Sequence, residues 1–346
     1  MTIDVRPTAE SSAEPAPLVL LPAPPVSAAL AARRTAWMLR MSLRRELVVQ
    51  GWSDRALLCG VRDRQLARPR RGAYSPYDGF VALDRLGRHA VTSRAVLAQA
   101  DVPVALSHLS AAVWFGAPEW GLDLSEVHVT RFDRRSGRRE AGVVQHRGAL
   151  LPGDLVEVHG LPMVSPTRAA IELTTAVDTE VGLAQVNHLL HTRQTTPEAL
   201  RERLDLMRDW PETLRTEIVL RLADPRIESV LESRFVHFCY RNSLPRPEPQ
   251  VEVRCDETGD LLACLDFVWK AGRRRPKYAE LDGKVKYGEL LRPGQTAADV
   301  VLREKERDKM VKRRTGMDGE RFRWADLEPA REAITAERVR RLLADD

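Results

Sequence analysis

Three carboxylates near the C-terminal end of the sequence have the residue types and the spacing of a metal-dependent site. Asp266 interrupts the apolar run Leu261–Trp269, which has the composition of a buried strand. A buried carboxylate destabilises a protein unless it is paired or binds a cation. Glu280 and Asp282 follow in the next predicted strand, where residues two apart share a face. A hairpin would make Asp266 a cross-strand neighbour of Glu280, and three convergent carboxylates suit Mg²⁺ or Mn²⁺.

Charged residues on either side of these carboxylates would complete a hydrolytic site. Lys284 and Lys286 follow the second strand and would hold a water molecule or offset the charge that develops on a phosphate. Glu232, on the helix predicted before the strands, would orient a metal-bound water. The alternative interpretation is structural, because the acidic strand end could instead form salt bridges with the basic helix predicted for residues 296–314.

The order of these residues resembles the PD-(D/E)XK nuclease superfamily, and more narrowly the branch related to very-short-patch mismatch-repair endonucleases. The resemblance covers about residues 222–343 and includes the segment Glu280–Tyr287. It implies a restriction-endonuclease-like α/β domain that hydrolyses phosphodiester bonds in DNA. It also implies that Asp266 and Glu280 ligate the metal ion and that Glu232 supports them.

One position departs from the nuclease pattern. Asp282 stands where the family has its lysine, so Lys284 or Lys286 would have to supply that charge from another backbone position. The substitution favours the alternative of a regulator or antitoxin whose nuclease-like domain is degenerate and only adds DNA or protein contacts. Fold alone cannot choose between the two functions.

The segment of residues 42–74 predicts a winged helix. Gly51 ends the first helix of this segment, and Ser53 is placed to cap the second. Nine arginines and three acids lie between Arg40 and Arg71, a balance that suits a DNA phosphate backbone. The alternative is a small helical domain with a solvated arginine face. The candidate DNA-binding residues are Arg55, Arg62, Arg64, Arg68, Arg70 and Arg71.

The front two-thirds of the chain carries a second resemblance. The segments Arg64–Tyr74, Ser107–Ala112 and Gly160–Ala169 are similar to AbiEi-type antitoxins of type IV toxin–antitoxin systems. The resemblance covers about residues 40–220. It implies a winged helix that binds operator DNA, a following α+β domain that contributes to repression or to toxin neutralisation, and a toxin as a partner.

Four histidines in the middle of the chain suggest a metal or nucleophile site, but their spacing does not support one. No pair among them has the i, i+4 spacing of ligands on a helix, and no cysteine lies near them in the sequence. We therefore expect them to be packed or hydrogen-bonding residues. They are His108, His128, His146 and His159.

Composition sets the outer limits. The chain has 346 residues, 43% of them hydrophobic, and a formal net charge of +5. It has no apolar run of membrane-spanning length, so we expect no membrane partner. The four cysteines form no CxxC pair, and the acidic N-terminal segment has no export-signal pattern, which predicts a reducing cytoplasmic location.

These observations predict a multidomain protein with α+β and α/β parts. The expected units are a disordered leader (1–38), a winged helix-turn-helix domain (39–90), an AbiEi-like α+β domain (91–221) and a PD-(D/E)XK nuclease-like α/β domain (222–346).

Overall fold

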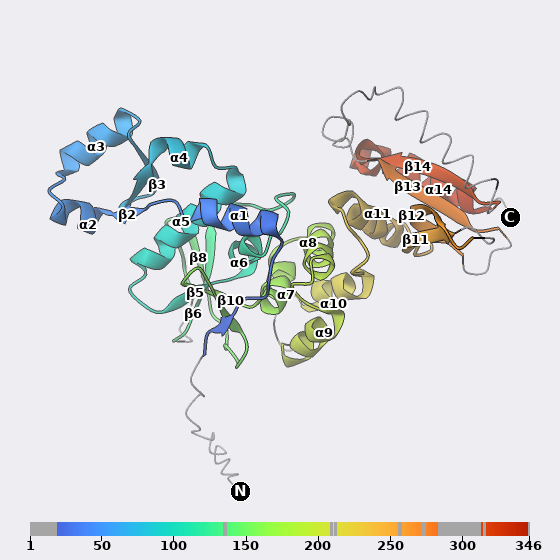
Figure 1. Ribbon diagram of the computed structural model, residues 1–346. Helices are drawn as coiled ribbons and strands as arrows, with labels where there is room; N and C mark the ends of the chain where they lie inside the picture. The colour runs from blue at the N-terminus through green and yellow to red at the C-terminus, as the bar shows by residue number, and fades with distance from the viewer. Residues whose placement is uncertain are drawn as a thin grey trace, which may run out of the picture.

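The computed structural model shows a mixed α/β protein with three sheets (Figure 1). It describes residues 19–133, 137–207, 210, 213–254, 258–270, 275–282, 313 and 316–344. The predicted lysine positions 284 and 286, and all of the predicted basic helix except Arg313, lie outside the described residues.

A small unit with a three-stranded sheet in the order β2-β4-β3 stands at one end of the molecule (Figure 1). Ser53 caps the second helix of this unit, α3, because the Ser53 hydroxyl accepts a hydrogen bond from the Ala56 amide at 3.1 Å. Gly72 turns the hairpin with a φ of +80°, a conformation that favours glycine. The elements are β2 (Ser42–Leu43), α2 (Arg44–Val49), α3 (Asp54–Arg62), β3 (Leu66–Arg70), β4 (Ala73–Pro76) and α4 (Tyr77–Val81).

The described part of the predicted leader is ordered, so the expectation of disorder is wrong for residues 19–38. Strand β1 (Leu21–Pro22) pairs in parallel with β9, and Ser27 caps helix α1 (Ala28–Trp37). Leu30, Arg34 and Trp37 recur at helical spacing and face the core, which the Pro and Ala content of the segment obscures. Trp37 packs edge-on against a second tryptophan of the core, with ring centroids 5.3 Å apart.

The middle of the chain is built on a seven-stranded sheet in the order β1-β9-β10-β5-β6-β8-β7. Its strands include β5 (Val104–Leu106), β6 (Val127–Arg131), β7 (Arg139–Glu140), β8 (Val143–His146), β9 (Leu155–Val158) and β10 (Leu161–Val164). Its helices are α5 (Arg85–Gln99), α6 (His108–Trp114), α7 (Pro166–Ala176), α8 (Thr179–His191), α9 (Pro197–Leu206) and α10 (Thr213–Leu222). Strand β6 pairs in parallel with β8 although the two are close in sequence, so the connection between them has to return along the sheet.

The C-terminal part has a four-stranded sheet in the order β11-β12-β13-β14, antiparallel except for the parallel pair β13 and β14. Phe235 of the helix before it is fully buried and stacks near Phe267 and Phe322 of the sheet. The elements are α11 (Val230–Arg241), β11 (Glu248–Arg254), β12 (Leu261–Trp269), β13 (Lys277–Asp282), β14 (Asp318–Arg323), the 3₁₀ helices Trp324–Leu327 and Pro329–Arg331, and α14 (Glu332–Ala344).

One hydrophobic core joins the middle and C-terminal parts. Arg234 donates to the Glu180 carboxylate at 2.8 Å, and its guanidinium lies 5.3 Å from the Trp120 ring centroid and 4.3 Å from that of Trp324. The Arg234 guanidinium thus contacts one aromatic ring from the middle part and one from the C-terminal part, so the two parts pack directly against each other.

Candidate functional site

Exposed arginines line the outer face of α3 and the hairpin behind it. Leu57 and Gly60 of α3 are buried, which leaves Arg55 and Arg62 on the solvent side of the helix. Arg62 forms a surface ion pair with its neighbour Asp63 at 2.8 Å. Such an exposed pair contributes little to stability, so it leaves the Arg62 cation able to exchange partners. The hairpin and its flanks add exposed side chains at Arg64, Arg68 and Arg71.

Two contacts orient this arginine surface, one inside the small unit and one to α5. Arg44 forms a bidentate pair with Asp54 in the first turn of α3, with distances of 2.7 and 2.6 Å. The Gln99 amide at the end of α5 donates to the Arg71 carbonyl at 2.9 Å, which ties the hairpin turn down. The arginine surface is therefore held by the fold around it.

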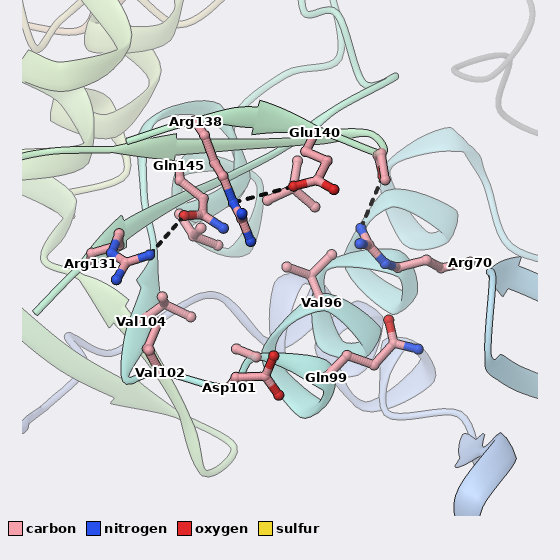
Figure 2. Close-up of a pocket in the computed structure, with 14 residues that line it drawn as sticks. Arg70, Val96, Gln99, Asp101, Val102, Val104, Arg131, Arg138, Glu140 and Gln145 are labelled. Carbon is pink, nitrogen blue, oxygen red and sulfur yellow. Dashed lines mark hydrogen bonds and ion pairs between the residues drawn. The ribbon is translucent and has the colours of Figure 1, made fainter. Parts of the chain in front are cut away.

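Arg70 does not share that surface. Its guanidinium is directed into a pocket between the hairpin, α5 and β8, and donates to the Ala141 carbonyl at 3.2 Å (Figure 2). Burial lowers the pKa of Arg70 from its usual value. Arg70 thus joins the hairpin to the middle of the chain, and its contact with DNA stays a prediction.

The pocket beside Arg70 has a volume of about 270 Å³ and is lined by paired charges. Arg138 lies 3.3 Å from the Glu140 carboxylate, and Arg131 donates to the Gln145 side chain at 3.2 Å (Figure 2). Because these cations already have partners, we interpret the pocket as a polar interface between the hairpin unit and the middle of the chain.

The structure places two of the predicted carboxylates side by side. Strands β12 and β13 run antiparallel, and Phe267 pairs with Ala279. One residue further along the same register, Asp266 faces Glu280. The Leu281 amide donates to an Asp266 oxygen at 2.7 Å, which orients that carboxylate toward β13.

Glu232 lies at the start of α11 and is largely a capping residue. Its carboxylate accepts hydrogen bonds from the Glu228 amide at 3.0 Å, the Ser229 hydroxyl at 2.6 Å and the Gln250 side chain at 3.1 Å. Burial raises the pKa of Glu232, and the negative charge of Asp266 adds to that rise. Glu232 is thus near the predicted site but is engaged by its own helix.

Asp282 lies beside two arginines of the neighbouring strand. Its carboxylate lies 3.6 Å from the Arg321 guanidinium and 3.9 Å from that of Arg323, on the neighbouring strand β14. Among the described residues, Asp266, Glu280 and Asp282 do not bring ligand atoms within 4.8 Å of one another as a set. Among the residues that it describes, the structure therefore does not show the convergent triplet that the sequence predicts, although the strands of Asp266 and Glu280 pair.

Three histidines form a cluster that the sequence interpretation missed. One ligand atom from each of His108, His128 and His146 lies within 4.8 Å of the other two. The nearest pair is His128 Nδ1 and His146 Nε2, which are 2.9 Å apart. His159 stays outside this group, as an exposed residue after β9.

The missed signal lies in strand pairing. His128 and His146 come from parallel neighbours β6 and β8, in which Thr130 pairs with His146, and residues two apart share a face. His108 starts α6, where the Ser107 amide donates to the His128 carbonyl at 3.0 Å. Sequence spacing cannot show these long-range pairings.

Comparison with known proteins assigns the middle of the chain. Residues 90–234 match the family described as the AbiEi antitoxin C-terminal domain. The match begins inside α5 and ends inside α11, so it contains the seven-stranded sheet except β1, together with the histidine cluster. It confirms the AbiEi-type expectation for this region and does not extend to the C-terminal sheet.

No curated protein matches the chain. In the part of the chain that the structure describes, no helix has both the length and the apolar character needed to cross a membrane.

Proposed function

We propose that this protein is a DNA-binding transcriptional regulator of the antitoxin class in a type IV toxin–antitoxin system. The observation that carries the proposal is the match to the AbiEi antitoxin C-terminal domain at residues 90–234, behind a unit of short helices and a hairpin with an exposed arginine surface. In this proposal the unit is a winged helix that binds duplex DNA. The middle region contributes to repression or to the neutralisation of a toxin partner.

The proposed DNA contacts follow from the exposed side of the winged helix. Helix α3 would enter the major groove, where Arg55 and Arg62 reach base edges or phosphates. Arg64, Arg68 and Arg71 would contact the phosphate backbone from the hairpin side. Arg70 is directed into the pocket beside β8, and its contact with DNA is not part of this proposal.

Charge reversal on the hairpin tests the proposal. We expect the double variant Arg68→Glu/Arg71→Glu to bind a fluorescein-labelled mixed-sequence duplex at least about tenfold more weakly at about 0.1 M salt, because two phosphate contacts become repulsive. The slope of log K against log salt should become shallower by about 2. Fluorescence anisotropy across a salt series measures both quantities.

Arg201→Glu is the matched control, since Arg201 is an exposed arginine on α9 whose charge pair with Glu198 is 3.9 Å long. The control should bind DNA as the unmodified protein does. Equal affinity of the hairpin variant and this control would overturn the proposed DNA surface.

A metal-dependent endonuclease is the second candidate function, favoured by the placement of Asp266 opposite Glu280. Two neighbouring carboxylates are a sufficient protein contribution for Mg²⁺ or Mn²⁺ when a phosphate supplies further oxygens. In this candidate Asp266 and Glu280 would hold the ion, which would supply an activated water, and Glu232 would orient that water. Lys284 and Lys286 remain candidates for offsetting charge.

A cleavage assay separates the two functions. If the second candidate holds, the protein cuts duplex or mismatched DNA with Mg²⁺ or Mn²⁺, and both Asp266→Asn and Glu280→Gln lower the rate by about 100-fold or more. Glu252→Gln is the control, because Glu252 is an exposed acid on the adjacent strand β11. Intact DNA binding without cleavage under any of these conditions would remove the nuclease and leave the regulator.

A further inference from the structure

The histidine cluster has the donor set of a transition-metal site. His108 is buried, and His128 and His146 are partly exposed, so an ion could reach the cluster from solvent. The rings of His108 and His146 stack with centroids 3.6 Å apart, and those of His128 and His146 are 5.0 Å apart. Like-charged imidazolium rings would repel at these distances, so the cluster requires neutral rings, which is the state that ligates metals.

The nitrogen positions are near those of a coordinated ion. Two ligands on a tetrahedral Zn²⁺ with Zn–N bonds of about 2.0–2.1 Å are about 3.3 Å apart. His128 Nδ1 and His146 Nε2 are 2.9 Å apart and form a hydrogen bond, which an ion would replace, and all three ligand atoms lie within 4.8 Å of one another. Coordination therefore requires the nearest pair to open by a few tenths of an ångström and the stacked His108 ring to tilt toward them.

His108 is held in place by the arrangement that metal ligands commonly have. Its Nδ1 lies 3.1 Å from the Ser107 hydroxyl and 3.4 Å from the buried Glu172 carboxylate, which leaves Nε2 for an ion. Glu172 is in turn fixed by Arg168 Nε at 2.7 Å. A carboxylate behind a histidine ligand sets the tautomer and raises the basicity of the other nitrogen.

A buried hydroxyl next to the cluster also lacks a partner. Thr130 lies two residues after His128 and pairs with His146, so the three side chains share one face of the sheet. The Thr130 hydroxyl is buried and has no hydrogen-bond partner among the described residues. A water in the fourth position of a three-histidine site would provide one.

From these observations we propose that His108, His128 and His146 bind one divalent transition-metal ion, with Zn²⁺ as the preferred ion. Three imidazoles and one open position are a common donor set for zinc, and imidazole also suits Co²⁺ and Ni²⁺. The ion would join α6 to β6 and β8 within the AbiEi-like region. The site is separate from the arginine surface and from the C-terminal carboxylates.

Metal titration of the full chain tests this site. The protein, without a histidine tag, is treated with a chelator, dialysed, and titrated with Co²⁺ and then Zn²⁺. We expect one Co²⁺ per chain, seen by the visible absorption of four-coordinate cobalt, and its displacement by one equivalent of Zn²⁺. Saturating Zn²⁺ should raise the melting temperature by about 5 °C, because the ion binds only the folded state.

Variants assign the ligands. His128→Gln and His146→Gln should each lose the cobalt absorption and the zinc-dependent rise in melting temperature, while His159→Asn should retain both. A wild-type protein with neither signal would overturn the proposal, and so would folded ligand variants that bind as His159→Asn does. Since the wild-type titration needs no variant, the test stands even if a substitution unfolds the chain.

Discussion

Replacing Arg168 with methionine is expected to destabilise the protein by about 3–5 kcal/mol, because it would leave the buried Glu172 carboxylate without its cation and the buried Asp154 carboxylate with Arg203 alone. Arg168 and its two acidic partners are almost completely buried. Its Nε donates to Glu172 at 2.7 Å, and one terminal nitrogen donates to Asp154 and, at 2.8 Å, to the Ala149 carbonyl. Urea unfolding followed by circular dichroism at pH 7 measures the change in the free energy of unfolding.

The cause can be separated from the loss of side-chain volume. Removing the opposing charge in Arg168→Met/Glu172→Gln should recover part of the loss, because only Asp154 would then remain charged, and Arg203 still lies 2.7 Å from it. Arg201→Ala, an exposed arginine on α9, should change the free energy of unfolding by less than about 0.5 kcal/mol. A loss below about 1 kcal/mol for Arg168→Met would show that the buried carboxylates relax or take up protons at little cost.

This network also explains a motif that sequence analysis assigned to the AbiEi resemblance. Arg168 lies in the segment Gly160–Ala169, one turn into α7, where Ser165 caps the helix. From there it reaches Asp154 before β9 and Glu172 on its own helix. Glu172 contacts His108, so the same arginine that supports the fold also positions the histidine cluster.

Local signals were sufficient for several elements. Ser53 begins α3, and Gly51 takes a positive φ value at the turn where the sequence predicts the end of the preceding helix. Strands β12 and β13, which carry Asp266 and Glu280, pair antiparallel as the sequence predicts, with Phe267 opposite Ala279. In each case the decisive interaction joins residues that are near in sequence, where caps, turns and alternation determine the geometry.

Interactions between distant segments were the ones that sequence missed. The ordered segment before Trp37 depends on β1 pairing with β9 and on α1 packing against residues near Trp114. Arg70 is directed into the pocket because the carbonyl of Ala141, in the turn between β7 and β8, lies within reach. The histidine cluster depends on the parallel pairing of β6 with β8. None of these pairings leaves a periodic pattern in the sequence.

Acidification is expected to destabilise the protein between pH 6.5 and about 4, because three buried or partly buried histidines must remain neutral in the folded state. Burial is the main factor that lowers the pKa of His89, His128 and His146 to about 4 in each case. The contacts of His89 suit a neutral ring: Nδ1 lies 3.1 Å from the Leu124 carbonyl, to which it can donate, and Nε2 lies 2.9 Å from the Ser110 hydroxyl. That hydroxyl accepts the His128 amide, so its proton is available to Nε2.

The direction of the pH dependence follows from the proton balance. An unfolded histidine has a pKa of about 6.5, so between that value and the lower folded value the unfolded chain binds more protons. The stabilisation is therefore complete above pH 6.5 and falls as the pH approaches 4. At pH 5 each group lowers the free energy of unfolding by up to about 2 kcal/mol, and the effects of neighbouring groups need not add.

Melting temperature from pH 7.5 to 4.5, measured with a chelator present so that no metal holds the rings neutral, should fall steeply. His89→Gln should be less stable at pH 7.5 but show a shallower decline, whereas His159→Asn should keep the full slope. Parallel curves for all three proteins would show that other groups govern acid unfolding.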